Sequence, residues 1–145
     1  MRVSEVVRLK KNDIDGDRKM MFIRKAKGKK DRYSILSEKA LKVLREYVKK
    51  YRPEKWLFPG AKENNPLSER SVQKVFKKAC KKAKITKDVS VHTLRHSFAT
   101  HLHENGVDIR YIQELLGHKS SKTTEIYTHI SKFDIEHINS PLDDL

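Results

Sequence analysis

The sequence predicts an α+β domain that is mostly helical and contains one small antiparallel sheet. The first observation is that apolar residues recur at helical spacing in several segments that are bounded by capping residues, glycine or proline. The second is a pair of short apolar runs near the N-terminus, joined by a charged connection with one glycine, which is typical of a β-hairpin. With 145 residues the chain has room for about one domain with a real core.

The first third of the chain is predicted to hold a short helix and the hairpin. Three valines at helical spacing predict the helix over residues 2–9, and residues 10–17 form a turn-rich connection. Residues 19–24 and 32–36 are the two predicted strands, and Gly28 lies in the charged run between them. The basic residues expected at the hairpin tip are Lys25, Lys27, Lys29, Lys30 and Arg32.

Two basic helices are predicted in the middle of the chain. Ser37 is a suitable N-cap for a helix over residues 38–51, which Pro53 ends. A short buried segment over residues 56–60 follows, and Ser68 begins the second helix. The residues of the second helix that we expect to face inward are Val72, Val75, Phe76, Ala79 and Ala83. The lysines that we expect on its outer face include Lys74, Lys77, Lys78 and Lys81.

The last third is predicted to be helical. A helix over residues 92–105 is closed by Gly106, and the next helix lies between Asp108 and Gly117. Residues 121–129 predict one more helix before the C-terminal tail. The residues of these helices that we expect in the core are Leu94, Phe98, Leu102, Ile109, Ile112, Leu115 and Leu116.

The charge of the chain points to a polyanion as partner. Lys and Arg number 33 against 19 Asp and Glu, a formal net charge of +14. No apolar run reaches the ~20 residues of a membrane-spanning helix, so nucleic acid is favoured over a membrane. Cys80 is the only cysteine, which excludes an internal disulfide and a cysteine-based zinc site and indicates a reducing, cytoplasmic compartment.

This charge is unevenly distributed. Residues 1–90 hold 28 basic and 11 acidic residues, a net charge of +17, whereas residues 91–145 hold 5 and 8, a net charge of −3. We therefore expect the first part to supply affinity for phosphate and the second part, which holds the histidines, to supply a different function.

A cationic group at residues 92–96 is a candidate site. His92, Arg95 and His96 share one broad helix face, where a guanidinium and an imidazole could clamp a phosphate. A solvated polar face fits this spacing equally well. The two histidines also have the i, i+4 spacing of zinc ligands, although the motif holds no acidic residue and no third ligand is evident.

A second candidate group follows the predicted helix that ends at Gly117. His118 comes directly after that glycine and Tyr127 nine residues later. Taken singly, each fits a structural role better, as a helix cap and as a half-buried packing residue. The chain has no Gly-rich phosphate loop and no carboxylate cluster that could hold two Mg²⁺ ions, so two-metal nuclease chemistry is not expected.

Together these residues resemble the catalytic domain of the tyrosine recombinases, the integrase and Xer-type family. The similarity spans nearly the whole chain, and the two C-terminal motifs are its most specific part. The matching segments are Arg2-Val3-Ser4-Glu5, Ala26-Lys27-Gly28-Lys29-Lys30-Asp31-Arg32, His92-Thr93-Leu94-Arg95-His96, Leu115-Leu116-Gly117-His118 and Thr123-Thr124-Glu125-Ile126-Tyr127. Ala26 stands where the family usually has glycine.

The resemblance implies site-specific cleavage and rejoining of DNA through a 3′-phosphotyrosyl intermediate, without a metal or other cofactor. It makes Tyr127 the nucleophile, His92 a base or proton relay and Lys27 the general acid for the 5′-oxygen. It assigns stabilisation of the phosphate oxygens to Arg2, Arg95 and His118. The DNA-binding residues that we expect are Lys25, Lys29, Lys30, Arg32, Lys74, Lys77, Lys78 and Lys81.

The resemblance also sets expectations for domains and partners. Residues 1–130 would be the catalytic domain, truncated before Arg2, and residues 131–145 a tail helix that docks into a neighbouring protomer or folds back on its own domain. The partners would be double-stranded DNA in the nucleoid and, in the full-length protein, a homotetramer on that DNA. Two alternatives stay open: a DNA-binding fragment inactive in isolation, and relaxation of DNA of the type IB topoisomerase kind.

Overall fold

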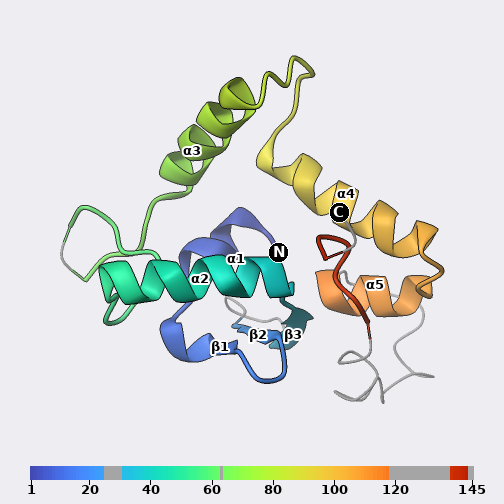
Figure 1. Ribbon diagram of the computed structural model, residues 1–145, viewed down its shortest axis with the longest axis horizontal. Helices are drawn as coiled ribbons and strands as arrows, with labels where there is room; N and C mark the ends of the chain where they lie inside the picture. Colours follow the sequence, from blue (N-terminus) through green and yellow to red (C-terminus); the bar gives the residue numbers. More distant parts are fainter. Residues whose placement is uncertain (25–30, 63, 118–137, 144–145) are drawn as a thin grey trace.

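The computed structural model describes residues 1–24, 31–62, 64–117 and 138–143 (Figure 1). Within these residues it is mostly helical with one small sheet, as the sequence predicts. The helices are α1 (Val3–Val7), α2 (Glu38–Tyr51), α3 (Glu69–Lys82), α4 (Val91–Glu104) and α5 (Ile109–Leu116), with a 3-10 turn, η1, at Lys11–Asp13. The strands are β1 (Ile14–Asp15), β2 (Met20–Ile23) and β3 (Arg32–Ile35).

The sheet is an antiparallel meander in the order β1-β2-β3. Met20 pairs with Ile35 and Ile23 with Arg32, so the predicted hairpin is present in its strands. The two-residue strand β1 was not predicted, because residues 10–17 are so rich in turn-forming residues that their pairing with β2 leaves no periodic pattern in the sequence.

Two apolar clusters lie on the two sides of this sheet. One joins Met20 and Ile35 to buried residues of α4 and α5, among them Leu102 and Leu115. The other joins Met21 and Ile23 to Leu36 of the β3–α2 connection and Leu41 of α2. Successive residues of a strand point to opposite faces, so neighbouring methionines serve different clusters. The sheet is therefore the middle layer between α2 and the pair α4–α5.

The ends of α2 and α5 form as the sequence predicts. The Ser37 hydroxyl accepts a hydrogen bond from the Ala40 N–H at 2.9 Å and begins α2, and Asp108 accepts one from Arg110 at the start of α5. Gly117, in the left-handed conformation with φ +64°, ends α5. Local hydrogen bonds and backbone freedom set these boundaries, which is why the sequence alone predicts them.

Several residues that we expected in the core are exposed. Val75 of α3 is 63% exposed, Leu94 of α4 and Ile109 of α5 are 58% exposed, and α3 has no buried residue. Figure 1 shows the reason for α3, which extends away from the sheet and from α5. The apolar stripe of α3 exists in the sequence, and α1 contacts the helix, but within the described part of the chain this contact leaves Val72 and Phe76 only half-buried.

The described part of the tail returns to its own domain. Ile138 packs against the cluster that holds Leu115, and the Asp143 carboxylate accepts hydrogen bonds from the Glu38 and Lys39 N–H groups at 3.1 and 3.2 Å. Asp143 and Ser37 together satisfy the first three N–H groups of α2. The predicted helix over residues 121–129 lies outside the described residues. The tail helix expected within residues 131–145 is not present in the described residues 138–143, which form an irregular stretch and a turn at Pro141.

None of the helices in the described ranges has the length and apolar composition that a membrane span requires.

Candidate functional site: an arginine cluster at the end of α5

Arg2 is placed by the start of α1. It is the N-cap residue of this helix, and its backbone N–H donates to the Glu5 carboxylate at 2.6 Å, which is one half of a capping box. Its guanidinium forms a longer ion pair with the same carboxylate, at 3.5 Å, and its side chain is 34% exposed. Arg2 is thus anchored by its backbone while its guanidinium remains accessible.

Glu5 has a second and stronger partner in Arg32. The two terminal nitrogens of Arg32 donate to the two carboxylate oxygens of Glu5, at 2.9 Å each, and the Arg32 side chain is only 1% exposed. Burial alone would raise the pKa of Glu5, but the hydrogen bonds from the Arg32 side chain and the Arg2 backbone, with the charge of Arg32, lower that pKa to about 2. Glu5 is therefore a fixed negative charge at neutral pH.

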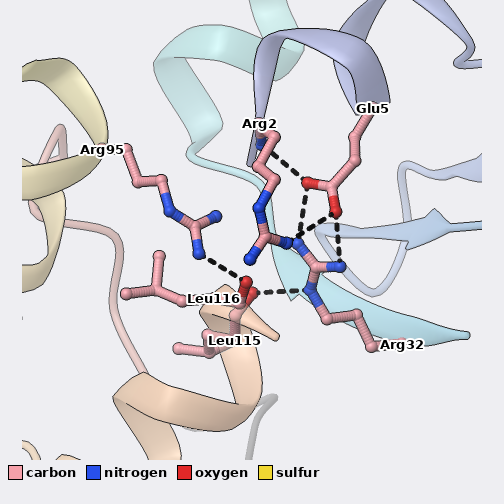
Figure 2. Close-up of polar contacts among 6 residues, drawn as sticks. All are labelled: Arg2, Glu5, Arg32, Arg95, Leu115 and Leu116. Carbon is pink, nitrogen blue, oxygen red and sulfur yellow. Dashed lines mark hydrogen bonds and ion pairs between the residues drawn. The ribbon is translucent and has the colours of Figure 1, made fainter. Parts of the chain in front are cut away.

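The C-terminal end of α5 holds two of the arginines. The Leu115 carbonyl accepts a hydrogen bond from Arg32 Nε at 2.9 Å, and the Leu116 carbonyl accepts one from Arg95 Nη2 at 2.7 Å (Figure 2). Both carbonyls belong to the last turn, where the helix has no internal donors left and carries partial negative charge. The end of α5 is thus a natural anchor for cations.

Arg95 comes from α4 and is the least satisfied member of the cluster. Within the described part of the chain, its Nη1 atom is buried and has no hydrogen-bond partner. Burial, and next the charge of Arg2, lower the pKa of Arg95 below its ordinary value. A buried N–H group without an acceptor costs about 1–3 kcal/mol, and more when the group is charged. The cluster is therefore suited to an acceptor that carries negative charge.

Three guanidiniums and one carboxylate leave this cluster with excess positive charge. Figure 2 shows Arg2 and Arg95 side by side above the end of α5, with Arg32 and Glu5 paired on the side of Arg2 away from Arg95. Arg32 and Glu5 neutralise each other, so the uncompensated charge belongs to Arg2 and Arg95. An oxyanion such as phosphate matches two guanidiniums in both charge and donor geometry.

The histidines of α4 lie at its N-terminal end. His92 precedes Arg95 by three residues, and both His92 and His96 are exposed. No group of three or more His, Cys, Asp or Glu that could hold a metal ion occurs among the residues with described positions.

The structure brings together only part of the predicted site. Arg2 and Arg95, 93 positions apart in the sequence, lie side by side. Lys27, His118 and Tyr127 lie outside the described residues, as do the hairpin-tip lysines Lys25, Lys29 and Lys30. The expected DNA-binding lysines of α3, which are Lys74, Lys77, Lys78 and Lys81, are all exposed.

Arg32 requires a correction. We expected it to bind DNA from the hairpin tip, but its guanidinium is buried between Glu5 and the end of α5. Sequence reasoning also missed Glu5. Its position three residues after an N-cap was the available signal, because that is the capping-box spacing. The role of Arg32 had no local signal, since its partners lie 27 and 83 residues away.

Comparisons with known proteins agree with this geometry. The model of the phage integrase family matches residues 1–133. The chain is 41% identical over 143 residues to tyrosine recombinase XerD of Staphylococcus saprophyticus, covering 93% of this chain and 48% of that protein. It is also 41% identical over 143 residues to tyrosine recombinase XerC of Halalkalibacterium halodurans, covering 91% and 46%.

Solved structures give the same result. The crystal structure of XerA recombinase matches with a TM-score of 0.75 at 37% identity, covering 91% of this chain and 49% of that one. The integrase from mycobacterium phage Brujita matches with a TM-score of 0.72 at 29% identity, covering 94% and 45%. The chain spans about half the length of the curated relatives that it matches.

Proposed function

Because the chain belongs to the phage integrase family of tyrosine recombinases, we propose that it carries the catalytic site of a site-specific DNA recombinase that cleaves and rejoins strands through a 3′-phosphotyrosyl link. The observation that carries this proposal is that Arg2 and Arg95 lie side by side (Figure 2), and that the buried Nη1 of Arg95 has no acceptor within the described residues. A non-bridging oxygen of the scissile phosphate would supply that acceptor.

The two arginines would act mainly on the transition state. Attack on phosphorus concentrates negative charge on the non-bridging oxygens, and donors already in place stabilise this charge without reorganisation. The Leu116 carbonyl holds the Arg95 guanidinium, and the capping box of α1 fixes the backbone of Arg2, so both arginines are placed before a phosphate binds. Removing one such donor typically lowers a rate by about 10²–10³-fold.

The remaining roles come from the family resemblance. The Tyr127 oxygen would attack phosphorus, and the bond from phosphorus to the 5′-oxygen would break. His92 would accept the tyrosine proton and Lys27 would donate a proton to the leaving 5′-oxygen, with His118 as a further donor to the phosphate. Attack by a 5′-hydroxyl on the link reverses these steps, so the bond energy is conserved and neither ATP nor a metal is needed.

Binding to duplex DNA would depend on the lysine-rich surface. The exposed lysines of α3 and the lysines of the hairpin tip would contact backbone phosphates on either side of the cut site, which adds affinity without sequence readout. We further propose that the full-length protein acts as a homotetramer on DNA, in the nucleoid of the cytoplasm, with residues 131–145 as the tail of a catalytic domain over residues 1–130.

The test is formation of a covalent protein–DNA adduct. The protein is incubated with nicked duplexes tiled across the DNA that flanks its gene, beside Tyr127→Phe as the matched control. We expect an adduct with a subset of duplexes, lost in Tyr127→Phe and reduced at least 100-fold in Arg95→Met. Absence of any adduct that depends on Tyr127 would overturn the proposal in favour of DNA binding alone. Relaxation of an arbitrary supercoiled plasmid with equal adducts on every duplex would also overturn it, in favour of a topoisomerase.

A further inference from the structure

Arg32 is the most deeply buried charged side chain of the arginine cluster, and it faces the protein rather than the open side of the site. All three of its nitrogens donate hydrogen bonds: Nε to the Leu115 carbonyl, and the two terminal nitrogens to the two oxygens of Glu5, each at 2.9 Å. With its side chain 1% exposed, it is out of reach of a DNA phosphate. Its contribution has to act through its neighbours.

Those neighbours hold the two arginines that face the phosphate. Glu5 accepts the backbone N–H of Arg2 at 2.6 Å, and the residue after Leu115 supplies the carbonyl that binds Arg95 at 2.7 Å. One guanidinium therefore ties the start of α1 to the end of α5. The planar fork of arginine fixes the relative position of these elements, because its three nitrogens bond in set directions.

Arg32 also determines which partner Glu5 takes. The Arg2 guanidinium already lies 3.5 Å from Glu5, close enough to become its main ion pair if Arg32 were absent. Such a change would pull Arg2 toward the carboxylate and neutralise it. With Arg32 present, its guanidinium compensates the charge of Glu5. The charge of Arg2 therefore remains available to an anion.

Gly117 completes this arrangement. A Cβ atom at this position would lie 2.9 Å from Arg32 Nη1, closer than real Cβ atoms come to a neighbour, and a tight 3.0 Å from Arg32 Cζ. The glycine thus leaves room for the Arg32 guanidinium beside the end of α5. It also adopts φ +64°, which side chains rarely tolerate.

We propose that Arg32 is a positioning residue for the phosphate site, which holds Arg2 and Arg95 in place and keeps the Glu5 carboxylate from neutralising Arg2. The proposal rests on the proposed function, since it assigns Arg32 to the site in which Arg2 and Arg95 contact the scissile phosphate. It predicts that Arg32 governs the rate of cleavage and has little influence on the affinity for DNA.

The experiment compares Arg32→Met, Arg32→Lys and the double variant Glu5→Gln/Arg32→Met under single-turnover conditions. The control is Arg24→Met, which removes another arginine paired with a buried carboxylate, that of Asp13, at 2.6 and 3.0 Å. Rates of adduct formation at saturating duplex, the duplex concentration for half-saturation and the melting temperature are measured for each protein.

We expect Arg32→Met to lower the saturated rate at least 100-fold and to change the half-saturating concentration less than threefold. Arg32→Lys keeps the positive charge but removes the planar guanidinium, so we expect its saturated rate to fall about tenfold. The double variant removes the competing carboxylate, so its saturated rate should be at least tenfold higher than that of Arg32→Met. Arg24→Met should stay within threefold of the unchanged protein in both quantities.

Two results would overturn the positioning role. One is a rate loss that follows the melting temperature across all four variants, Arg24→Met included, because that shows destabilisation alone. The other is a double variant no faster than Arg32→Met although its melting temperature recovers, because Glu5 would then not compete for Arg2.

A readout without cleavage separates this inference from the proposed function. Inorganic phosphate is titrated while the guanidinium Nε–H signals of Arg2 and Arg95 are followed by NMR. We expect both signals to shift in the unchanged protein, and at least tenfold weaker binding of phosphate in Arg32→Met. Equal phosphate affinity in the two proteins would overturn the positioning role even if adducts form, whereas a missing adduct with intact phosphate binding would count against the proposed function alone.

Discussion

The guanidinium of Arg32 in β3 and the carboxylate of Glu5 in α1, two residues 27 positions apart in the sequence, meet through two hydrogen bonds of 2.9 Å. This pair lies next to Arg2, on the side away from Arg95 (Figure 2). It links α1 to β3, and the third nitrogen of Arg32 links β3 to the end of α5.

Gly117→Ala should destabilise the protein more than Gly106→Ala. Both glycines have positive φ, +64° and +80°, so each alanine costs about 1–2 kcal/mol in backbone strain. Only at Gly117 does the added Cβ meet the Arg32 guanidinium, whereas nothing lies within 4 Å of it at Gly106 among the described residues. Urea unfolding should show an additional loss of about 1 kcal/mol or more for Gly117→Ala. Equal losses would show that the contact with Arg32 does not constrain the site.

The Glu5 carboxylate should make stability dependent on pH in the acid range. Its pKa is lowered from 4.5 to about 2 in the folded protein, so its contribution is fully present above pH 4.5 and is lost as the pH falls toward 2. A shift of this size corresponds to about 3 kcal/mol. Urea unfolding between pH 7 and pH 2.5 should therefore show Glu5→Gln less stable at neutral pH and converging with the unchanged protein in acid. A constant difference over that range would contradict the assignment.

Arg95→Met should keep or raise stability while it abolishes anion binding. The substitution removes a buried guanidinium nitrogen without an acceptor among the described residues and relieves repulsion by Arg2, at the cost of the bond to the Leu116 carbonyl. An anion bound only by the folded state raises the melting temperature. We expect phosphate to raise it in the unchanged protein and not in Arg95→Met, at equal ionic strength set with chloride. A similar rise in both would remove Arg95 from the anion site.

Lysines on α3 should control the salt dependence of DNA binding. Lys77→Gln should weaken binding to any duplex about equally and lower the slope of log K against log salt by about 0.9, the value for one phosphate contact. Lys62→Gln, which removes an exposed lysine of the loop before α3, is the control and should leave the slope unchanged. Equal slopes for both variants would show that Lys77 does not contact a DNA phosphate.

Asp143 should stabilise α2 from the C-terminal side of the chain. Its carboxylate accepts the N–H groups of Glu38 and Lys39, so Asp143→Ala should cost about 0.5–2 kcal/mol, comparable to Ser37→Ala at the adjacent N-cap. The double variant should lose close to the sum, because the two side chains serve different N–H groups. No loss in Asp143→Ala would show that the tail does not cap this helix in solution.

Local chemistry explains which features could be predicted from the sequence. The correctly predicted features depend on residues that are close together in the sequence. They are the strands at residues 19–24 and 32–36, the N-caps at Ser37 and Asp108 and the helix end at Gly117. Arg2 and Arg95 were recognised as site residues because of the motifs around them. No contact between the two was needed for that recognition.

Only the tertiary structure decided what the side chains face. A stripe of apolar residues marks one side of α3, but whether Val75 is buried depends on the element packed against it, and the sequence of α3 holds no information on that element. Arg32 resembled an exposed basic residue of a hairpin because its sequence neighbours are charged. Its burial follows from two partners that the fold brings from α1 and α5, since an arginine can be buried when a carboxylate and helix carbonyls satisfy its charge and its donors.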